Sequence, residues 1–210
     1  MSRRLDRVIF GVVLSAILTL VLGGIGWVGW LVFGTTSRTL NGVPALLESY
    51  GETCVAAESA GVLSDGDVIG VLRFGSADAF AWPVVVGVET ESLQQGLGWY
   101  SDTSLPGERG NFAVTGHRIT NGAPLADLLE MSAGELIYVS TCQADYLYEI
   151  FVPAAEFVVS NDADWVVQAL PGEPGALPST PLLVVITHQD LVPTEDRAVA
   201  VAKLIETSIN

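Results

Sequence analysis

The longest uninterrupted apolar pattern in the chain lies near its N-terminus. From Val8 to Phe33 there are 26 consecutive residues without a charged side chain. As an α-helix this run would extend about 39 Å, which exceeds the roughly 30 Å of a bilayer core. A cleaved signal peptide is the alternative, but its apolar region is only about 7–15 residues long. It also ends at a small-residue cleavage site, which Gly34–Ser37 matches poorly. The pattern therefore predicts one uncleaved transmembrane helix.

Charges on either side of this run predict its orientation. Arg3, Arg4 and Arg7 precede it, and Arg38 is the only basic residue in the segment that follows. Because positive residues stay on the cytoplasmic side, the N-terminus is expected in the cytoplasm and the rest of the chain outside.

Beyond the apolar run, short segments rich in Val, Ile, Phe and Tyr are bounded by Gly, Pro, Asp or Ser, which is typical of strands joined by turns. The expected strands are Asp67–Phe74, Trp82–Val88, Asn111–Gly116, Leu136–Thr141, Tyr146–Val152, Leu182–Thr187 and Ala198–Leu204. Brief helical patterns cover Glu89–Gln95 and Pro124–Met131, and Leu40–Ala60 has a mixed pattern that allows a helix leading away from the membrane. Many short strands with few helices predict a mainly β protein, built as a closed barrel or a sandwich.

These patterns divide the chain into four parts. Residues 1–7 are the predicted cytoplasmic N-terminus and residues 8–33 the transmembrane helix. Residues 34–62 form a predicted stalk with helical character, although Gly and Pro within it disfavour a helix. Residues 63–210 form the predicted extracytoplasmic β domain.

The acidic charge balance limits the possible partners. The chain has 24 Asp and Glu against nine Lys and Arg, a net charge of −15. A nucleic-acid backbone requires a basic surface, so nucleic acid is not an expected partner. So acidic a domain is also repelled by anionic lipid or wall polymer.

Candidate reactive residues are few. The only histidines, His117 and His188, come at the C-terminal ends of predicted strands, where loops shape pockets. Arg197 opens the last predicted strand, nine residues after His188. A lone histidine is more often a hydrogen-bonded structural residue than a reactive one. Three such residues at strand boundaries nevertheless define a candidate site.

The stretch LPGERGNFAVTGHRITNGAPL (residues 105–125) resembles the part of sortases that carries the catalytic histidine, and it is close to the class E type. The resemblance covers roughly residues 67–204. It includes WPVVVGV, GLGWY, GELIYV, YLYEI and the segment from Leu183 to Leu204. It implies an eight-stranded β-barrel with short helices, held outside a Gram-positive cell by a membrane helix. Sortases are transpeptidases whose thiolate cleaves a Leu-Pro-x-Thr-Gly-type sorting signal. They then transfer the acyl group to an amine of a wall precursor or a pilus subunit.

The resemblance assigns family roles to individual residues. His117 matches the catalytic histidine, a general acid or base, and Arg197 matches the arginine that stabilises the oxyanion or substrate. Counting back the family's nine residues from Arg197 places His188 at the position of the nucleophilic cysteine and Thr187 at the preceding threonine. A shift of one residue with a gap would place Thr187 there instead. Neither alignment provides a thiol.

The missing thiol changes the expected function. An imidazole attacking an amide would give a reactive acyl-imidazole, and loss of a nucleophile removes most of an enzyme's rate. We expect a degenerate member, weakly active or inactive, that acts in peptide or partner binding without a cofactor. The partners considered are a sorting-signal peptide, a cell-wall or pilus protein, or another sortase.

Two alternatives place other chemistry at the site. Cys54 or Cys142 could supply a displaced nucleophile, although a structural role is expected, as a buried thiol or as a disulfide between them. The two histidines could bind a metal ion with a third ligand. The candidates for that third ligand are Asp190, Glu195 and Glu108.

If the two histidines face each other, charge repulsion and partial burial should lower the pKa of at least one ring. Arg118, next to His117, is expected to be a surface or strand-end residue.

Overall fold

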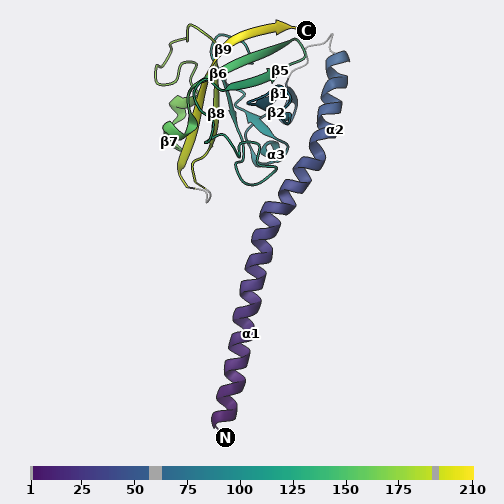
Figure 1. Cartoon of the computed structure of the whole chain (residues 1–210), viewed down its shortest axis with the longest axis vertical. Helices are drawn as coiled ribbons and strands as arrows, with labels where there is room; N and C mark the ends of the chain where they lie inside the picture. The colour runs from purple at the N-terminus through teal and green to yellow at the C-terminus, as the bar shows by residue number, and fades with distance from the viewer. Residues whose placement is uncertain (1, 57–62, 191–193) are drawn as a thin grey trace.

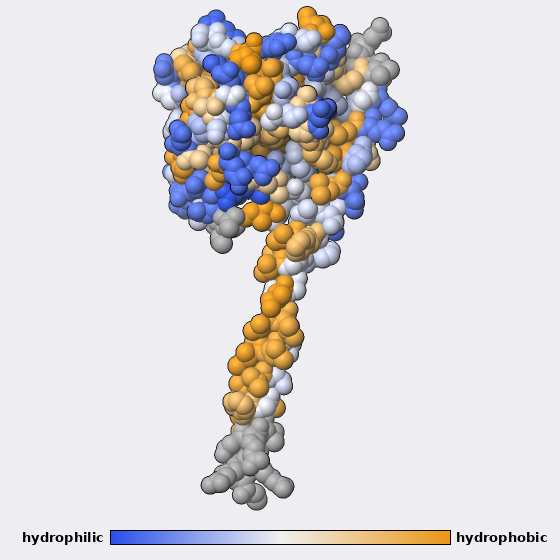
Figure 2. Space-filling view, viewed as in Figure 1, coloured by the Kyte–Doolittle hydropathy of each residue, from blue (hydrophilic) through white to orange (hydrophobic). Residues whose placement is uncertain are grey.

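A computed structural model describes residues 2–56, 63–190 and 194–210. The chain begins with α1 (Ser2–Gly29), which continues through the π-helical turn η1 (Trp30–Gly34) into α2 (Thr35–Ala56). The residues flanking η1 keep right-handed helical dihedrals, so the helix continues through it. This helix is long and apolar enough to cross a membrane, and no residue of its most apolar 18-residue stretch is buried. Figure 1 shows α1 extending away from the β domain, and Figure 2 shows apolar side chains along its visible surface.

Helix α2 lies against the β domain rather than standing free of it (Figure 1). Val43 is only 2% exposed and belongs to the main core. The Thr39 hydroxyl donates to the carbonyl of Gln94 at 2.8 Å, and the Tyr50 hydroxyl donates to that of Ile69 at 3.2 Å. This packing explains why α2 forms despite an internal proline and two glycines, because tertiary contacts outweigh weak helix propensity. The expected helix at Leu40–Ala60 is thus confirmed as far as Ala56, and its last four residues lie outside the described residues.

A disulfide fixes the end of α2. Cys54 of α2 is bonded to Cys142, in the turn between two strands of the sheet, with a Cα–Cα distance of 5.0 Å. Of the two structural roles expected for the cysteines, the disulfide is therefore the one present.

The β domain is a closed barrel, as predicted. Its strands are β1 (Val68–Phe74), β2 (Trp82–Val86), β3 (Leu97–Trp99), β4 (Asn111–Thr115), β5 (Leu136–Ser140), β6 (Ala144–Val152), β7 (Val158–Ser160), β8 (Leu182–His188) and β9 (Asp196–Ile209). Eight of them follow the order β6-β5-β1-β2-β3-β4-β8-β9, and a β6–β9 pairing closes the ring. The ninth, β7, pairs with β9 outside the ring. Two pairs are parallel, β2–β3 and β4–β8.

The apolar run of β8 is buried on both of its faces. Leu183 and Val185 belong to the core inside the barrel. Val184 and Ile186 pack in a second cluster with Val166 of the 3₁₀-helix η3 (Asp164–Val167). Because both faces of β8 are covered, its sequence is continuously apolar rather than alternating between apolar and polar residues.

Two expectations about local structure were wrong or incomplete. Pro124–Met131 is not a helix but a series of turns, in which Leu128 N bonds to Leu125 O and Glu130 N to Asp127 O. Ala123 before it has φ 53°, a left-handed conformation that does not lead into a helix. The strands β3 and β7 have three residues each, too short to produce a recognisable pattern. Short helices remain at α3 (Thr90–Leu93), η2 (Ala154–Glu156) and η3.

Candidate functional site

The parallel pairing of β4 and β8 brings the two histidines to the same end of the barrel. Thr115 lies opposite Ile186 in the register, and His188 is the last residue of β8. His117 follows the end of β4 by two residues. Two hydroxyls fix the strand ends, since Thr115 Oγ1 donates to Ile186 O and Thr187 Oγ1 donates to Gly116 O, each at 3.0 Å. Residues 71 positions apart are thereby held side by side.

Gly116 has a steric role directly before His117. A Cβ at this position would lie 2.6 Å from Leu97 Cδ2 and 3.2 Å from Leu125 Cδ1. Its φ is not in the left-handed region, so close packing is the reason for glycine here. Because Gly116 has no side chain, the backbone directly before His117 packs closely against Leu97 and Leu125 of the core.

Arg197 completes the set of residues that the sequence predicted for the site. In the β8–β9 pairing its Cα lies opposite that of His188. Its Nη1 donates to Thr194 O at 2.7 Å and to Asp196 O at 3.1 Å. The structure therefore brings His117, His188 and Arg197 together, although nothing in their sequence spacing requires it.

Two further residues, Arg118 and Tyr100, lie near the site. Arg118 Nη1 donates to Gln189 O at 2.8 Å, which joins the segment after β4 to the segment after β8. Tyr100 follows β3; burial raises the pKa of its hydroxyl, and nearby Arg197 acts in the opposite direction. Sequence reasoning treated Arg118 as a surface or strand-end residue and did not identify Tyr100. The only signal for Arg118 was its position next to His117.

The two imidazoles have unused hydrogen-bonding atoms. Nδ1 of His117 lies 3.3 Å from Thr120 Oγ1. Its Nε2 is buried, and so is Nδ1 of His188, and neither atom has a hydrogen-bond partner among the described residues. A buried polar atom without a partner is rare and commonly marks a place where a ligand or water binds.

Both imidazoles favour the neutral form. Burial lowers the pKa of His117 below 6.5, and the neighbouring His188 lowers it further. Burial also lowers the pKa of His188, and the charges of Arg197 and Arg118 add to the effect. The expected lowering is thus confirmed for both rings, and each is mainly neutral near pH 7.

These shifts predict how stability depends on pH. The unfolded chain binds protons at histidine near pH 6.5, whereas the folded chain resists them until its lowered pKa values are reached. The free energy of unfolding should therefore fall as the pH drops from about 7 through the window between the two sets of pKa values. Urea unfolding of the native chain and of a His117→Gln/His188→Gln variant, at about pH 7.5 and about pH 5.5, measures the effect. The native chain should lose more stability than the variant; equal losses would contradict the assignment.

The two alternative chemistries receive little support from the site. Cys54 and Cys142 are the only cysteines of the chain, and their sulfurs are joined, so neither is a free thiol. In residues 2–56, 63–190 and 194–210, no group of three or more His, Cys, Asp or Glu residues is placed to hold a metal ion. The two guanidinium groups near His188 would also repel a cation.

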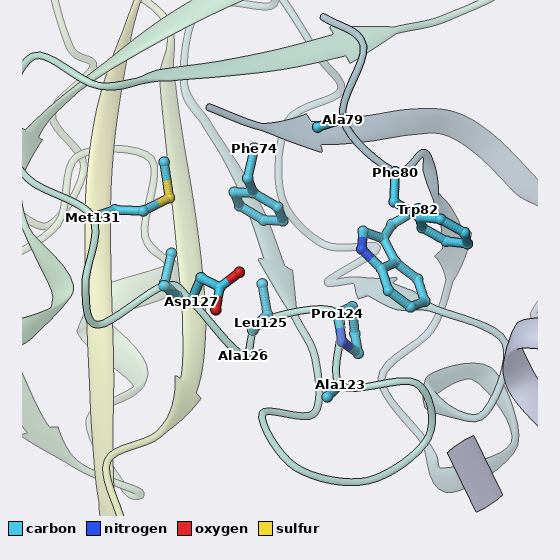
Figure 3. A pocket seen from close by; sticks show the side chains of 11 residues that line it. Phe74, Ala79, Phe80, Trp82, Ala123, Pro124, Leu125, Ala126, Asp127 and Met131 are labelled. Carbon is cyan, nitrogen blue, oxygen red and sulfur yellow. The ribbon is translucent and has the colours of Figure 1, made fainter. Parts of the chain in front are cut away.

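A hollow of about 250 Å³ lies beside the loop that follows His117 (Figure 3). Its wall contains Phe74, Phe80, Trp82, Leu125 and Met131, and no histidine or arginine. Figure 3 shows the aromatic rings on one side and the loop on the other. Asp127 is the one charged residue among the lining residues, and the hollow is separate from the histidine pair.

Comparisons with known proteins point to one family. A model of the sortase domain matches residues 74–205. Sortase D of Bacillus subtilis is 28% identical over 85 residues, which are 40% of this chain and 41% of that protein. The match thus spans less than half of that relative.

The barrel also has relatives among solved structures. Sortase E from Streptomyces avermitilis is 26% identical, with a TM-score of 0.61 over 70% of this chain and 93% of that chain. Sortase E1 from Streptomyces coelicolor, solved with a tripeptide in the active site, is 19% identical. It shares the fold, with a TM-score of 0.60 over 70% of this chain and 94% of that chain.

Proposed function

Because the chain belongs to the sortase family, we propose that it is a class E-like member that binds a sorting-signal peptide without turning it over. The observation that carries this proposal is the composition of the site. An imidazole, His188, lies beside His117 and opposite Arg197, and both cysteines of the chain are bonded to each other. The proposed site thus keeps the family's histidine and arginine and has a second histidine in place of the nucleophilic cysteine.

The alignment of His188 with the nucleophile is supported by the surroundings of both candidate positions. Thr187 is 1% exposed and its hydroxyl is bonded to Gly116 O. His188 is the partly exposed residue that follows. An attacking atom must reach the substrate, so position 188 fits the role of the missing cysteine better than position 187.

An imidazole at this position is a poor replacement for a thiol. A thiolate combines high nucleophilicity with an accessible pKa and forms a thioester that persists until an amine attacks it. An acyl-imidazole reacts readily with water, so transfer to an amine would compete poorly with hydrolysis. The donors Arg197 and His117 would remain and could still bind the peptide.

The proposal extends to the placement of the chain. Residues 1–7 lie in the cytoplasm, 8–33 cross the cell membrane, 34–62 form the stalk, whose helix α2 packs against the barrel, and 63–210 form the extracytoplasmic domain. The apolar helix and the arginines before it support this arrangement. A disulfide also fits an oxidising exterior.

The proposal predicts binding without covalent chemistry. Full-length protein in detergent is incubated with a fluorescent Leu-Pro-Glu-Thr-Gly peptide, and the intact mass and the fluorescence anisotropy are measured. We expect a saturable increase in anisotropy, no acyl adduct and no cleaved peptide. An acyl adduct on any residue would refute the loss of transpeptidase activity, and the absence of any binding would refute the binding role. A peptide of the same composition in scrambled order is the control for nonspecific binding.

A further inference from the structure

Two imidazoles and two guanidinium groups lie together where β4 and β8 end. We call them the His/Arg cluster: His117, His188, Arg118 and Arg197. His117 and His188 lie close enough for the charge of one ring to affect the other. The charges of Arg118 and Arg197 both act on His188. The cluster contains two of the nine Lys and Arg residues of a chain that has 24 Asp and Glu residues. A concentration of positive and proton-donating groups in so acidic a protein requires an explanation.

In the part of the chain that the structure describes, no carboxylate forms an ion pair with this cluster. The ion pair found among the described residues joins Lys203 to Glu149, elsewhere on the barrel. Arg118 and Arg197 instead donate Nη1 to backbone carbonyls. Each guanidinium has five N–H groups in a planar fork, so most of these donors remain available to a ligand.

Carboxylates also lie on the loop after β8, but none of them forms an ion pair with the cluster among the described residues. On the loop after β8, the carboxylate of Asp190 accepts a hydrogen bond from Thr194. Glu195 and Asp196 are exposed to solvent, which screens them. Asp164 acts on Tyr100 rather than on either histidine. Of the charges that shift the pKa of the two rings, none is a carboxylate.

We propose that this cluster binds the free C-terminal carboxylate of a peptide, the group that a sorting signal exposes when its cleavage ends in hydrolysis rather than in transfer to an amine. The inference rests on the proposed function and specifies its ligand. A carboxylate only accepts hydrogen bonds and carries a negative charge, and it matches a planar arginine fork. The intact peptide bond of an uncleaved signal offers these donors only a neutral carbonyl oxygen, which forms weaker hydrogen bonds than a carboxylate. The site therefore favours the product of hydrolysis over the uncleaved signal.

The buried ring nitrogens give this binding a pH dependence. Among the described residues, His117 Nε2 and His188 Nδ1 have no hydrogen-bond partner. A bound carboxylate would stabilise the imidazolium form by charge and hydrogen bonding, which raises the pKa of the ring it contacts. Affinity should therefore increase as the pH falls from about 7.5 to about 5.5, a range over which the peptide carboxylate stays ionised.

The experiment compares peptides that differ only at the C-terminus. Fluorescent Leu-Pro-Glu-Thr with a free carboxylate, the same peptide as its C-terminal amide, and uncleaved Leu-Pro-Glu-Thr-Gly amide are titrated into full-length protein in detergent. We expect the free acid to bind at least about tenfold more tightly than either amide, as a charge-assisted fork contact allows. This preference should be lost in Arg197→Gln and reduced in Arg118→Gln. Arg109→Gln is the matched control. Arg109 precedes the N-terminal end of β4, whereas the cluster lies at the C-terminal end, and its Nε donates a hydrogen bond to Pro178 O.

The possible results separate this inference from the proposed function. Equal binding of acid and amides would overturn the carboxylate site and leave peptide binding intact. Binding of none of the three peptides would overturn both. A preference that persists in Arg197→Gln and Arg118→Gln, with unchanged melting temperatures, would place the carboxylate elsewhere and overturn the inference.

Discussion

Replacing His188 with cysteine is expected to give the protein an acyl-enzyme intermediate that the native chain does not form. The variant sulfur would lie at the end of β8, beside His117 and opposite Arg197. The nearby guanidinium groups would lower the pKa of the thiol and increase its thiolate fraction. Removal of a nucleophile costs several orders of magnitude in rate, so its return should raise peptide cleavage at least about 100-fold above the native chain. Intact-mass measurement with Leu-Pro-Glu-Thr-Gly detects the adduct, and chromatography measures cleavage.

Two variants test the position of the new thiol. His188→Ala should form no adduct, which attributes the chemistry to sulfur rather than to removal of the imidazole. Thr187→Cys should also fail, because residue 187 is 1% exposed and its side chain is bonded to Gly116. An adduct in Thr187→Cys but not in His188→Cys would show that position 187 aligns with the nucleophile. A folded, peptide-binding His188→Cys protein without any adduct would show that the site has lost more than its thiol.

Removing the disulfide should cause the largest loss of stability. Cys54 and Cys142 are 88 residues apart, and the bond joins α2 to the β5–β6 turn. In the chain-entropy model, closing a loop of this length stabilises the folded state by about 4–5 kcal/mol. A Cys54→Ser/Cys142→Ser variant should lose most of that amount, measured by urea unfolding of the barrel followed by tryptophan fluorescence.

Reduction of the native protein provides the control for the disulfide variant. Dithiothreitol should destabilise the native chain by a similar amount and leave the double variant unchanged. If the variant is as stable as the native chain, the hydrogen bonds of Thr39 and Tyr50 and the burial of Val43 are sufficient to hold α2. The disulfide would then have no stabilising role.

The sequence predicted elements whose patterns are local. The uncharged run from Val8, the apolar run of β8 and the strands bounded by turn residues each depend on neighbouring residues. The structure has helices and strands at these places. The prediction of a helix at Pro124–Met131 is wrong because its spacing of leucines fits a helix, whereas the segment forms turns with i to i+3 hydrogen bonds after the left-handed Ala123.

The site could be predicted only in part from the residues. No local pattern shows that His117 and His188 meet, since their proximity arises from the parallel pairing of β4 with β8. Resemblance to a family supplied that expectation. It could not indicate that Arg118 acts on His188 or that Arg197 acts on Tyr100, because both effects depend on distances between separate segments of the chain.

The attachment of α2 determines how the barrel meets its ligand. Near its start, Thr35 and Thr36 accept hydrogen bonds from the backbone of Asn121 and Gly122, a few residues beyond His117. Near its end, the helix is covalently linked to the barrel. With α1 in a bilayer, the attachment of α2 at both of its ends would hold the histidine site at a constant height above the lipid surface. Encounters would then depend on lateral diffusion within one thin layer, so tethered ligands displayed in that layer would be captured far more often than soluble ones.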